Sequence, residues 1–377
     1  MLVVAYGGNI AQNAYDALVA SDIASYLKPG FSVSIKPNLV CSRPACEGAT
    51  THPEVVEGIL LFLKSFGVSK IKIIESSSIF SNTKQAFRNC GYDALSHKYS
   101  VPLVDLKSDG TTAKKYEDSK IEICKEALNT DFLINVPVLK AHSQTRLTCC
   151  MKNLKGCIPD REKRRFHSIG LHKPIAALNM LVKTGYCVVD GICGDLSFEE
   201  GGTPIIGNRI IVGRDPLLVD SFCAELIGYR ADEIGYIAQG EKMGVGRYYA
   251  QNTKIVELNV QNKPIWDAKT DCRAANRYRG AIDEDAACSA CYSSLIFALH
   301  RLGAKAPTDG GKICIGQGFK GKSGPRPDSS PGPSTSLSPN PSLGVGNCCS
   351  GFERHIPGCP PKATDILAAF ERYGTGQ

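Results

Sequence analysis

The chain has 377 residues, of which 43% are hydrophobic and 21% charged, and its formal net charge is +7. This composition is that of a globular protein with room for two domains. The sequence contains no apolar run of eighteen residues, which argues against a membrane-spanning helix. Few aromatic residues accompany the basic ones, which argues against a nucleic-acid partner. The first residues lack an export signal, so we expect a cytoplasmic protein.

Short β-branched runs alternate with longer amphipathic stretches over the first part of the chain. We predict strands at residues 2–6, 32–37, 70–74, 131–136, 187–189 and 209–212. We predict helices between them at residues 11–27, 53–66, 83–90, 174–182 and 216–227. This alternation predicts parallel β-α-β units. The expected fold class is α/β, with a layered, mostly parallel sheet in residues 1–270 and a small cysteine-rich module in residues 271–377.

Polar residues follow most of the predicted strands. In parallel α/β sheets, ligands bind beyond the C-terminal ends of the strands. We therefore predict one polar rim made of residues that follow five strands: Lys36 and Asn38, Glu75, Lys140 and His142, Asp190, and Arg214 and Asp215. For any one of these residues, a polar loop or a helix cap is the simpler interpretation.

The densest polar segment lies between residues 143 and 172. Lys152, Asn153 and Lys155 stand beside Gly156, which lacks a side chain and so lets backbone approach a ligand. Lysines and amides that converge in this way suit a carboxylate or a phosphate. A solvated basic loop fits the same residues.

Histidines in and beside this segment are candidates for proton transfer, because imidazole titrates near neutral pH. His142 and His167 are the candidate catalytic residues. Together with His172 they could instead form a metal site, although their spacing is not diagnostic of one. Helix capping is the structural alternative for His167 and His172.

The C-terminal cysteines are the strongest chemical signal in the sequence. Cys288 and Cys291 are two residues apart, and single cysteines follow in Gly/Pro-rich loops. Thiolates select zinc, copper(I) or iron–sulfur clusters. Cys359 is followed directly by proline, as in ferredoxin-type cluster sequences, which favours a [4Fe–4S] cluster over zinc. The predicted ligands are Cys288, Cys291, Cys348 or its neighbour Cys349, and Cys359.

Other cysteines leave further interpretations open. The chain has 17 cysteines, and without an export signal we expect reduced thiols, so disulfides are the less favoured alternative. Cys149, Cys150 and Cys157 lack a CxxC pair, so a second metal site there stays open. A Pro/Ser/Gly-rich tract at about residues 322–343 separates the two halves of the proposed cluster site, and we predict that it is a mobile loop.

Two resemblances to known proteins support these predictions. Residues 357–361 (PGCPP) resemble the cluster loop of the small subunits of respiratory complex I and nickel hydrogenases. Longer segments resemble the family catalogued as domain of unknown function 362, namely residues 35–40 (IKPNLV), 50–56 (TTHPEVV), 134–142 (INVPVLKAH), 151–156 (MKNLKG) and 189–191 (VDG). That resemblance implies an association with iron–sulfur clusters but no particular reaction.

We predict an iron–sulfur protein that acts in electron transfer or as a reductase on a small anionic ligand, with a redox partner protein and no membrane partner. In this mechanism the ligand is bound by Lys36, Lys140, Lys152 and Lys155, oriented by Asn38 and Asn153, and protonated by His142 or His167. The alternative is a non-catalytic binding or carrier module in which a cluster or a zinc ion has a structural role. A redox-inactive, metal-dependent enzyme using the three histidines is a third possibility.

Overall fold

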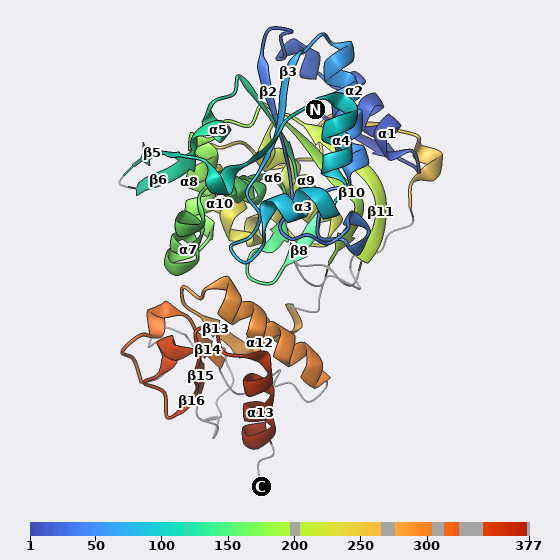
Figure 1. Ribbon diagram of the computed structural model, residues 1–377. Helices are drawn as coiled ribbons and strands as arrows, with labels where there is room; N and C mark the ends of the chain where they lie inside the picture. Colours follow the sequence, from blue (N-terminus) through green and yellow to red (C-terminus); the bar gives the residue numbers. More distant parts are fainter. Residues whose placement is uncertain (118, 197–203, 265–275, 304–312, 324–341, 375–377) are drawn as a thin grey trace. The chain divides into compact units, whose positions relative to one another are not determined.

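The structure is a computed structural model that describes residues 1–117, 119–196, 204–264, 276–303, 313–323 and 342–374. Most of the predicted Pro/Ser/Gly loop therefore lies outside the described residues. The chain forms two compact units (Figure 1). The first consists of Met1–Arg164 and Leu171–Thr270, and the second of Arg165–Gly170 and Asp271–Gln377.

An eight-stranded sheet organises the first unit, in the order β12-β1-β11-β10-β7-β2-β3-β4. The five strands β10, β7, β2, β3 and β4 are parallel to one another, whereas β11 is antiparallel to both β10 and β1. The α/β class with a mostly parallel sheet is thereby confirmed. The strands are β1 (Leu2–Tyr6), β2 (Ser32–Pro37), β3 (Lys70–Glu75), β4 (Leu103–Asp105), β7 (Phe132–Val136), β10 (Tyr186–Asp195), β11 (Pro204–Gly213) and β12 (Ile255–Leu258).

Helices lie on both faces of this sheet (Figure 1). One face buries alternate strand residues such as Val33, Ile35 and Ile134 against the apolar sides of α1 (Ile10–Val19) and α2 (Pro53–Ser65). The other helices are α3 (Thr83–Asn89), α4 (Tyr92–Tyr99), α5 (Lys125–Leu128), α6 (Cys150–Asn153), α7 (Asp160–Ile169), α8 (His172–Leu181), α9 (Pro216–Leu226) and α10 (Gly235–Lys242). Because side chains alternate along a strand, Lys36 and Asn135 point to the opposite face, where α6 contacts β7.

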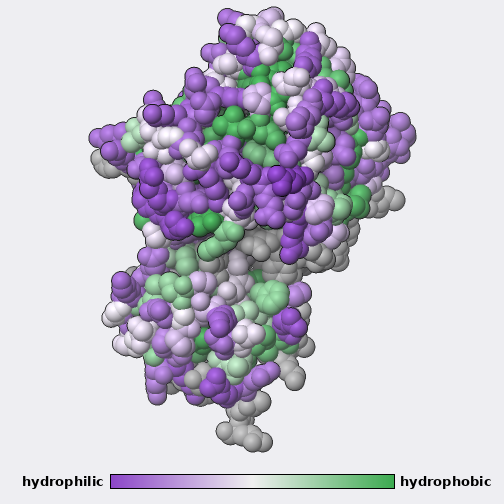
Figure 2. All heavy atoms as spheres, viewed as in Figure 1, coloured by the Kyte–Doolittle hydropathy of each residue, from purple (hydrophilic) through white to green (hydrophobic). Residues whose placement is uncertain are grey.

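Two small hairpins complete the first unit. Strands β5 (Thr111–Tyr116) and β6 (Ser119–Cys124) form one, and β8 (Lys140–His142) and β9 (Arg146–Thr148) form the other. Figure 2 shows hydrophilic side chains over most of the visible surface of this unit, with smaller apolar patches between them.

The second unit contains a four-stranded, all-parallel sheet in the order β13-β14-β15-β16. Its strands are β13 (Ile282–Glu284), β14 (Ile313–Ile315), β15 (Leu343–Val345) and β16 (Arg354–Ile356), and its helices are α12 (Ser289–Leu302) and α13 (Ala363–Gly374). The rings of Phe319 and Phe352 pack edge to face with their centroids 5.8 Å apart, in the same buried cluster as Cys314 and Cys349. Neither unit, over the residues described, has a helix that is long and apolar enough to span a membrane.

Candidate functional site

A buried polar network lies where β2, β3 and β7 end. We call Lys36, Asn38, Glu75, Asn135 and Asn153 the rim network. The ammonium group of Lys36 donates to Glu75 Oε2 at 2.8 Å, to the Pro37 carbonyl at 3.0 Å and to Asn153 Oδ1 at 3.3 Å. These three acceptors match the three protons of the ammonium group. Lys36 is therefore fully committed within the protein.

Asn153 joins the strands of the rim network. Its Oδ1 atom also accepts from Asn38 Nδ2 at 3.0 Å, and its own Nδ2 donates to Asn135 Oδ1 at 2.8 Å. A β-carbon added to Gly156 would collide with Glu75 Oε1 and lie 2.5 Å from Lys36 Nζ. The absence of a side chain at Gly156 thus makes room for the ion pair. This is a different role from the ligand approach that the sequence suggests.

The remaining predicted ligand-binding lysines have other surroundings. Lys140 is 1% exposed, and its Nζ donates to the Ala49 carbonyl at 2.6 Å. Lys152 and Lys155 are half-buried, and Lys152 Nζ donates to Thr148 Oγ1 at 3.1 Å. The structure therefore brings Lys36, Asn38 and Asn153 into one hydrogen-bonded group. Lys140 and Lys152 instead donate to Ala49 and Thr148.

The two predicted catalytic histidines belong to different compact units. His142 is the last residue of β8 and is 6% exposed. Its Nδ1 atom accepts hydrogen bonds from the backbone amides of Gln144 and Thr145, at 3.1 and 3.3 Å. These bonds place the ring proton of the neutral tautomer on Nε2. His167 is a half-buried residue of α7 in the short segment that groups with the second unit.

One predicted part of the rim was wrong. Arg214 and Asp215 follow β11, which runs antiparallel to β10. They therefore lie beside the N-terminal end of β10, at the opposite end of the strands from the rim network. Asp215 there caps α9 by accepting from the amides of Leu217 and Leu218. The sequence pattern identified the strand, but strand direction depends on pairing that the pattern does not encode.

A histidine–aspartate pair is the main feature that the sequence patterns did not predict. Asp190 is 0% exposed. Its Oδ2 atom accepts a hydrogen bond from the backbone amide of His52 at 2.7 Å and lies 2.8 Å from His52 Nδ1. Burial opposes protonation of the ring, but the Asp190 carboxylate outweighs it and raises the pKa of His52 above 6.5. The THP motif and the strand-end aspartate were visible in the sequence, yet nothing there paired them across 138 positions.

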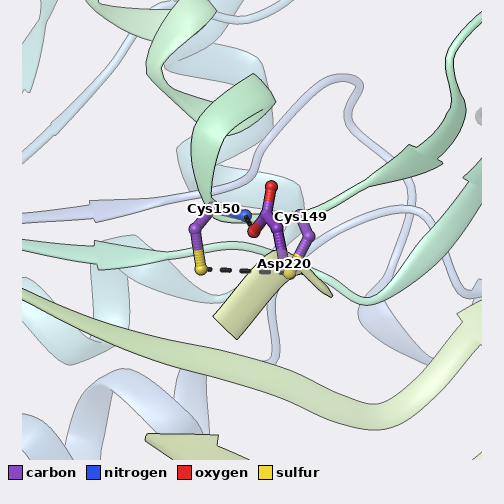
Figure 3. Close-up of side chains that lie close together, drawn as sticks. All are labelled: Cys149, Cys150 and Asp220. Carbon is purple, nitrogen blue, oxygen red and sulfur yellow. Dashed lines mark hydrogen bonds between the residues drawn. The ribbon is translucent and has the colours of Figure 1, made fainter. Parts of the chain in front are cut away.

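Thiols and a carboxylate also gather in the core of the first unit (Figure 3). The Cys149 and Cys150 sulfur atoms and a carboxylate oxygen of Asp220 lie within 4.8 Å of one another, and all three residues are 0% exposed. Burial raises the pKa of the Cys150 thiol, and the neighbouring thiols of Cys149 and Cys187 add to that increase. This group is a candidate metal site.

Cys157, which is near Cys149 and Cys150 in sequence, lies elsewhere in the fold. Burial raises its pKa to about 12, and its charged neighbours are Lys36, Glu75 and Lys163. The surroundings of Cys157 are thus those of the rim network. Asp220 and Cys223 on α9 take its place beside Cys149.

The C-terminal cysteines follow three strands of the small parallel sheet. Cys288 comes after β13, Cys348 after β15 and Cys359 after β16. A hydrogen bond from Cys291 lowers the pKa of Cys288 to about 6, which favours the thiolate form at neutral pH. Burial raises the pKa of Cys348, and the charges of Cys359 and Cys288 add to the effect. A β-carbon on Gly346 would lie 3.7 Å from Cys291 Sγ.

The structure distinguishes the adjacent residues Cys348 and Cys349. Cys349 is 0% exposed, packs with Phe319 and Phe352, and donates its thiol to the Cys314 carbonyl at 3.3 Å. Cys348 is half-buried and lies close enough to Cys288 and Cys359 for their charges to raise its pKa. Cys349 is therefore a core residue, and Cys348 is the better candidate ligand.

The fold and these sites define an α/β protein rich in cysteine with a candidate thiolate–carboxylate metal site. The chain belongs to the family described as Domain of unknown function (DUF362), whose profile matches residues 33–225, or 193 of the 377 residues. The match covers the rim network and the Cys149–Cys150–Asp220 group, and it ends before the C-terminal cysteines.

A curated relative is the thylakoid-associated protein sll1697 of Synechocystis sp., which is 26% identical over 238 residues. That alignment covers 61% of this chain and 74% of the relative. Among solved structures, the lactate racemase apoprotein from Thermoanaerobacterium thermosaccharolyticum matches with a TM-score of 0.38 and 14% identity. The match covers 64% of this chain and 57% of the racemase, and a likeness this distant says nothing about chemistry.

Proposed function

We propose that the second unit holds a [4Fe–4S] cluster on Cys288, Cys291, Cys348 and Cys359, and that the protein acts in electron transfer or as a reductase on a small anionic ligand. The observation that supports this is the position of the cysteines after β13, β15 and β16. Because these strands are parallel, their C-terminal ends share one edge of the sheet, and the three loops converge there.

The donor set fits a cluster chemically. All four proposed ligands are cysteines, and the Cys288 thiolate is the metal-binding form. When bound, a cluster of this kind supplies one-electron transfer. Cys291 is buried and Cys359 is exposed, so the proposed cluster would have one protein-covered side and one side open to a redox partner.

For a reductase, the first unit would provide ligand binding and the proton. Lys152 and Lys155 are half-buried, and we propose that they bind the anionic group while Asn38 orients it. Asn38 Oδ1 is a buried atom with no hydrogen-bond partner among the described residues, so it can accept a hydrogen bond from a ligand. His142, with its proton on Nε2, would protonate the reduced ligand.

Metal and sulfide analysis tests the cluster. After anaerobic purification, we expect about four irons and four acid-labile sulfides per chain, and an electron paramagnetic resonance signal after reduction. Cys288→Ser, Cys348→Ser and Cys359→Ser should each lower the iron content and alter or abolish the signal. Cys349→Ser is the matched control and should retain both. Zinc that is lost in Cys288→Ser, together with no acid-labile sulfide in the wild-type protein, would sink the redox proposal.

The alternative is a binding or carrier module with a structural metal. The full commitment of Lys36 to acceptors within the protein favours it, because that lysine is not available to a substrate. Lys152→Ala separates the two functions in the cluster-loaded protein. Loss of small-anion binding supports the reductase, whereas loss of a captured protein partner alone supports the carrier.

A cytoplasmic location stays a prediction, because the curated relative is named as thylakoid-associated. Cell fractionation tests it.

A further inference from the structure

The core of the first unit contains a group of metal-binding atoms that the proposed cluster does not use. Cys149 precedes α6, Cys150 begins it, and Asp220 comes from α9 (Figure 3). Cys223 follows Asp220 by three residues, on the same side of α9, and its thiol neighbours Cys149, although its sulfur does not lie within 4.8 Å of all three ligand atoms of the group. Segments 70 residues apart in the sequence therefore direct two thiols and a carboxylate into one enclosed space, with a third thiol beside Cys149.

Asp220 is the residue that requires an explanation. It is 0% exposed, and its carboxylate accepts the amides of Cys150 at 2.7 Å and Met151 at 3.1 Å. Its side-chain partners, Cys149 and Tyr236, carry no positive charge. No lysine, arginine or histidine forms an ion pair with it in the part of the chain that the structure describes. Burial raises the pKa of Asp220 well above 3.8 and so favours the neutral acid, whereas a bound cation would stabilise the carboxylate in the same buried position.

The spacing of the sulfur atoms indicates a single ion. Two thiolates bound to one tetrahedral zinc, each at about 2.3 Å, lie about 3.8 Å apart. The sulfur atoms of Cys149 and Cys150 are 3.9 Å apart. A four-iron cluster would instead hold each thiolate on a different iron atom, and adjacent cysteines are poorly suited to that arrangement.

We propose that Cys149, Cys150 and Asp220 bind a single zinc ion with a structural role, and that the Cys223 thiol beside Cys149 moves in to supply the fourth ligand. Zinc accepts both thiolate and carboxylate ligands, and structural zinc sites are four-coordinate and closed to solvent, as this group is. The ion would connect the start of α6 to α9. Because α6 also contains Asn153, the site would hold the Asn153 amide in place against Lys36 and Asn38.

Metal counting on the full-length protein tests this site separately from the cluster. We expect about one zinc per chain in the wild-type protein, with a drop of at least about tenfold in Cys150→Ser and Asp220→Asn. Cys157→Ser is the matched control, since it alters an equally buried thiol outside the group, and it should retain the zinc. Cys288→Ser should also retain the zinc, whatever happens to the iron.

X-ray absorption at the zinc edge tests the proposal even if the core variants do not fold. For the wild-type protein we expect a mixed shell of sulfur at about 2.3 Å and one oxygen at about 2.0–2.2 Å. An all-sulfur shell, zinc that persists in Cys150→Ser, or a folded protein without zinc would each overturn the proposal. Because iron content and zinc content are read independently, failure of the cluster leaves this test intact.

Discussion

Lys36 Nζ lies 2.8 Å from Glu75 Oε2, and the two side chains are 1% and 3% exposed. The pair joins neighbouring strands β2 and β3 at the edge of the sheet where the rim network lies. Removing one member of a buried pair leaves the other charge uncompensated. Lys36→Met or Glu75→Gln should therefore lower the free energy of unfolding by about 3–5 kcal/mol.

The double variant Lys36→Met/Glu75→Gln should lose less than the sum of the single losses, by about 1–3 kcal/mol. Urea denaturation followed by circular dichroism measures all three variants. The exposed pair of Arg230 and Asp232 is the control, and its removal should leave the transition midpoint unchanged. Strict additivity at Lys36 and Glu75 would show that the two charges do not stabilise each other.

Gly156 should tolerate no side chain. Gly156→Ala places a methyl group against Glu75 Oε1 and Lys36 Nζ, so we expect a loss of about 1–3 kcal/mol in the free energy of unfolding. Gly30→Ala is the control, because a β-carbon there meets no atom within 4 Å. Equal thermal midpoints for the two variants would contradict the close packing around the ion pair.

The ion pair of His52 and Asp190 should make stability depend on pH. The folded protein holds the pKa of His52 above 6.5, so protonated His52 stabilises the fold at low pH, and this contribution is lost as the pH rises through the raised pKa. The stability difference between wild type and His52→Asn should accordingly be larger at pH 5.5 than at pH 8.5.

Asp190→Asn supplies the control for this dependence. It removes the negative charge that favours protonated His52 and leaves the burial that opposes it, so in the Asp190→Asn background the effect of His52→Asn should no longer be larger at pH 5.5 than at pH 8.5. Denaturation curves at both pH values measure the difference. A pH-independent effect of His52→Asn in the protein that retains Asp190 is the result that would exclude the ion pair.

The small core of the second unit should depend on its two aromatic rings. Phe352 is 6% exposed and packs against Phe319, so Phe352→Ala should cost the second unit about 3–5 kcal/mol. Phe297 is 44% exposed, and Phe297→Ala should change stability by no more than about 0.5 kcal/mol. Limited proteolysis across a temperature series, with cleavage after residue 276 as the readout, compares the two.

Local patterns in the sequence were sufficient to predict the elements of the first unit but not their pairing. The strand predicted at residues 32–37 matches β2, and the helix predicted at 53–66 matches α2 to within one residue. The prediction at 187–189 found only the start of β10, which continues to Asp195 past an irregularity at Gly191. The strands of the second unit have three residues each, which is too short for a periodic signal.

The candidate sites were predictable only where the ligands were close in sequence or followed strands. Lys36, Asn38 and Glu75 were predicted at one rim because they follow strands, but nothing in the sequence paired Lys36 with Glu75, 39 positions away, or with Asn153. Asp220 and Cys223 are part of the amphipathic pattern of α9, and nothing in that pattern distinguishes a ligand from a buried core residue. Long-range pairing of this kind depends on the assembled fold.

The place of β1 in the sheet has a consequence during synthesis. All five residues of Leu2–Tyr6 are buried between β11 and β12, yet Gly213, the partner of Leu2, is made more than two hundred residues later. At translation rates of about 5–20 residues per second, this apolar strand waits roughly 10–40 s for its first neighbour. During that interval it presents two unpaired edges to other nascent chains. We expect the emerging protein to need a chaperone that recognises short apolar segments.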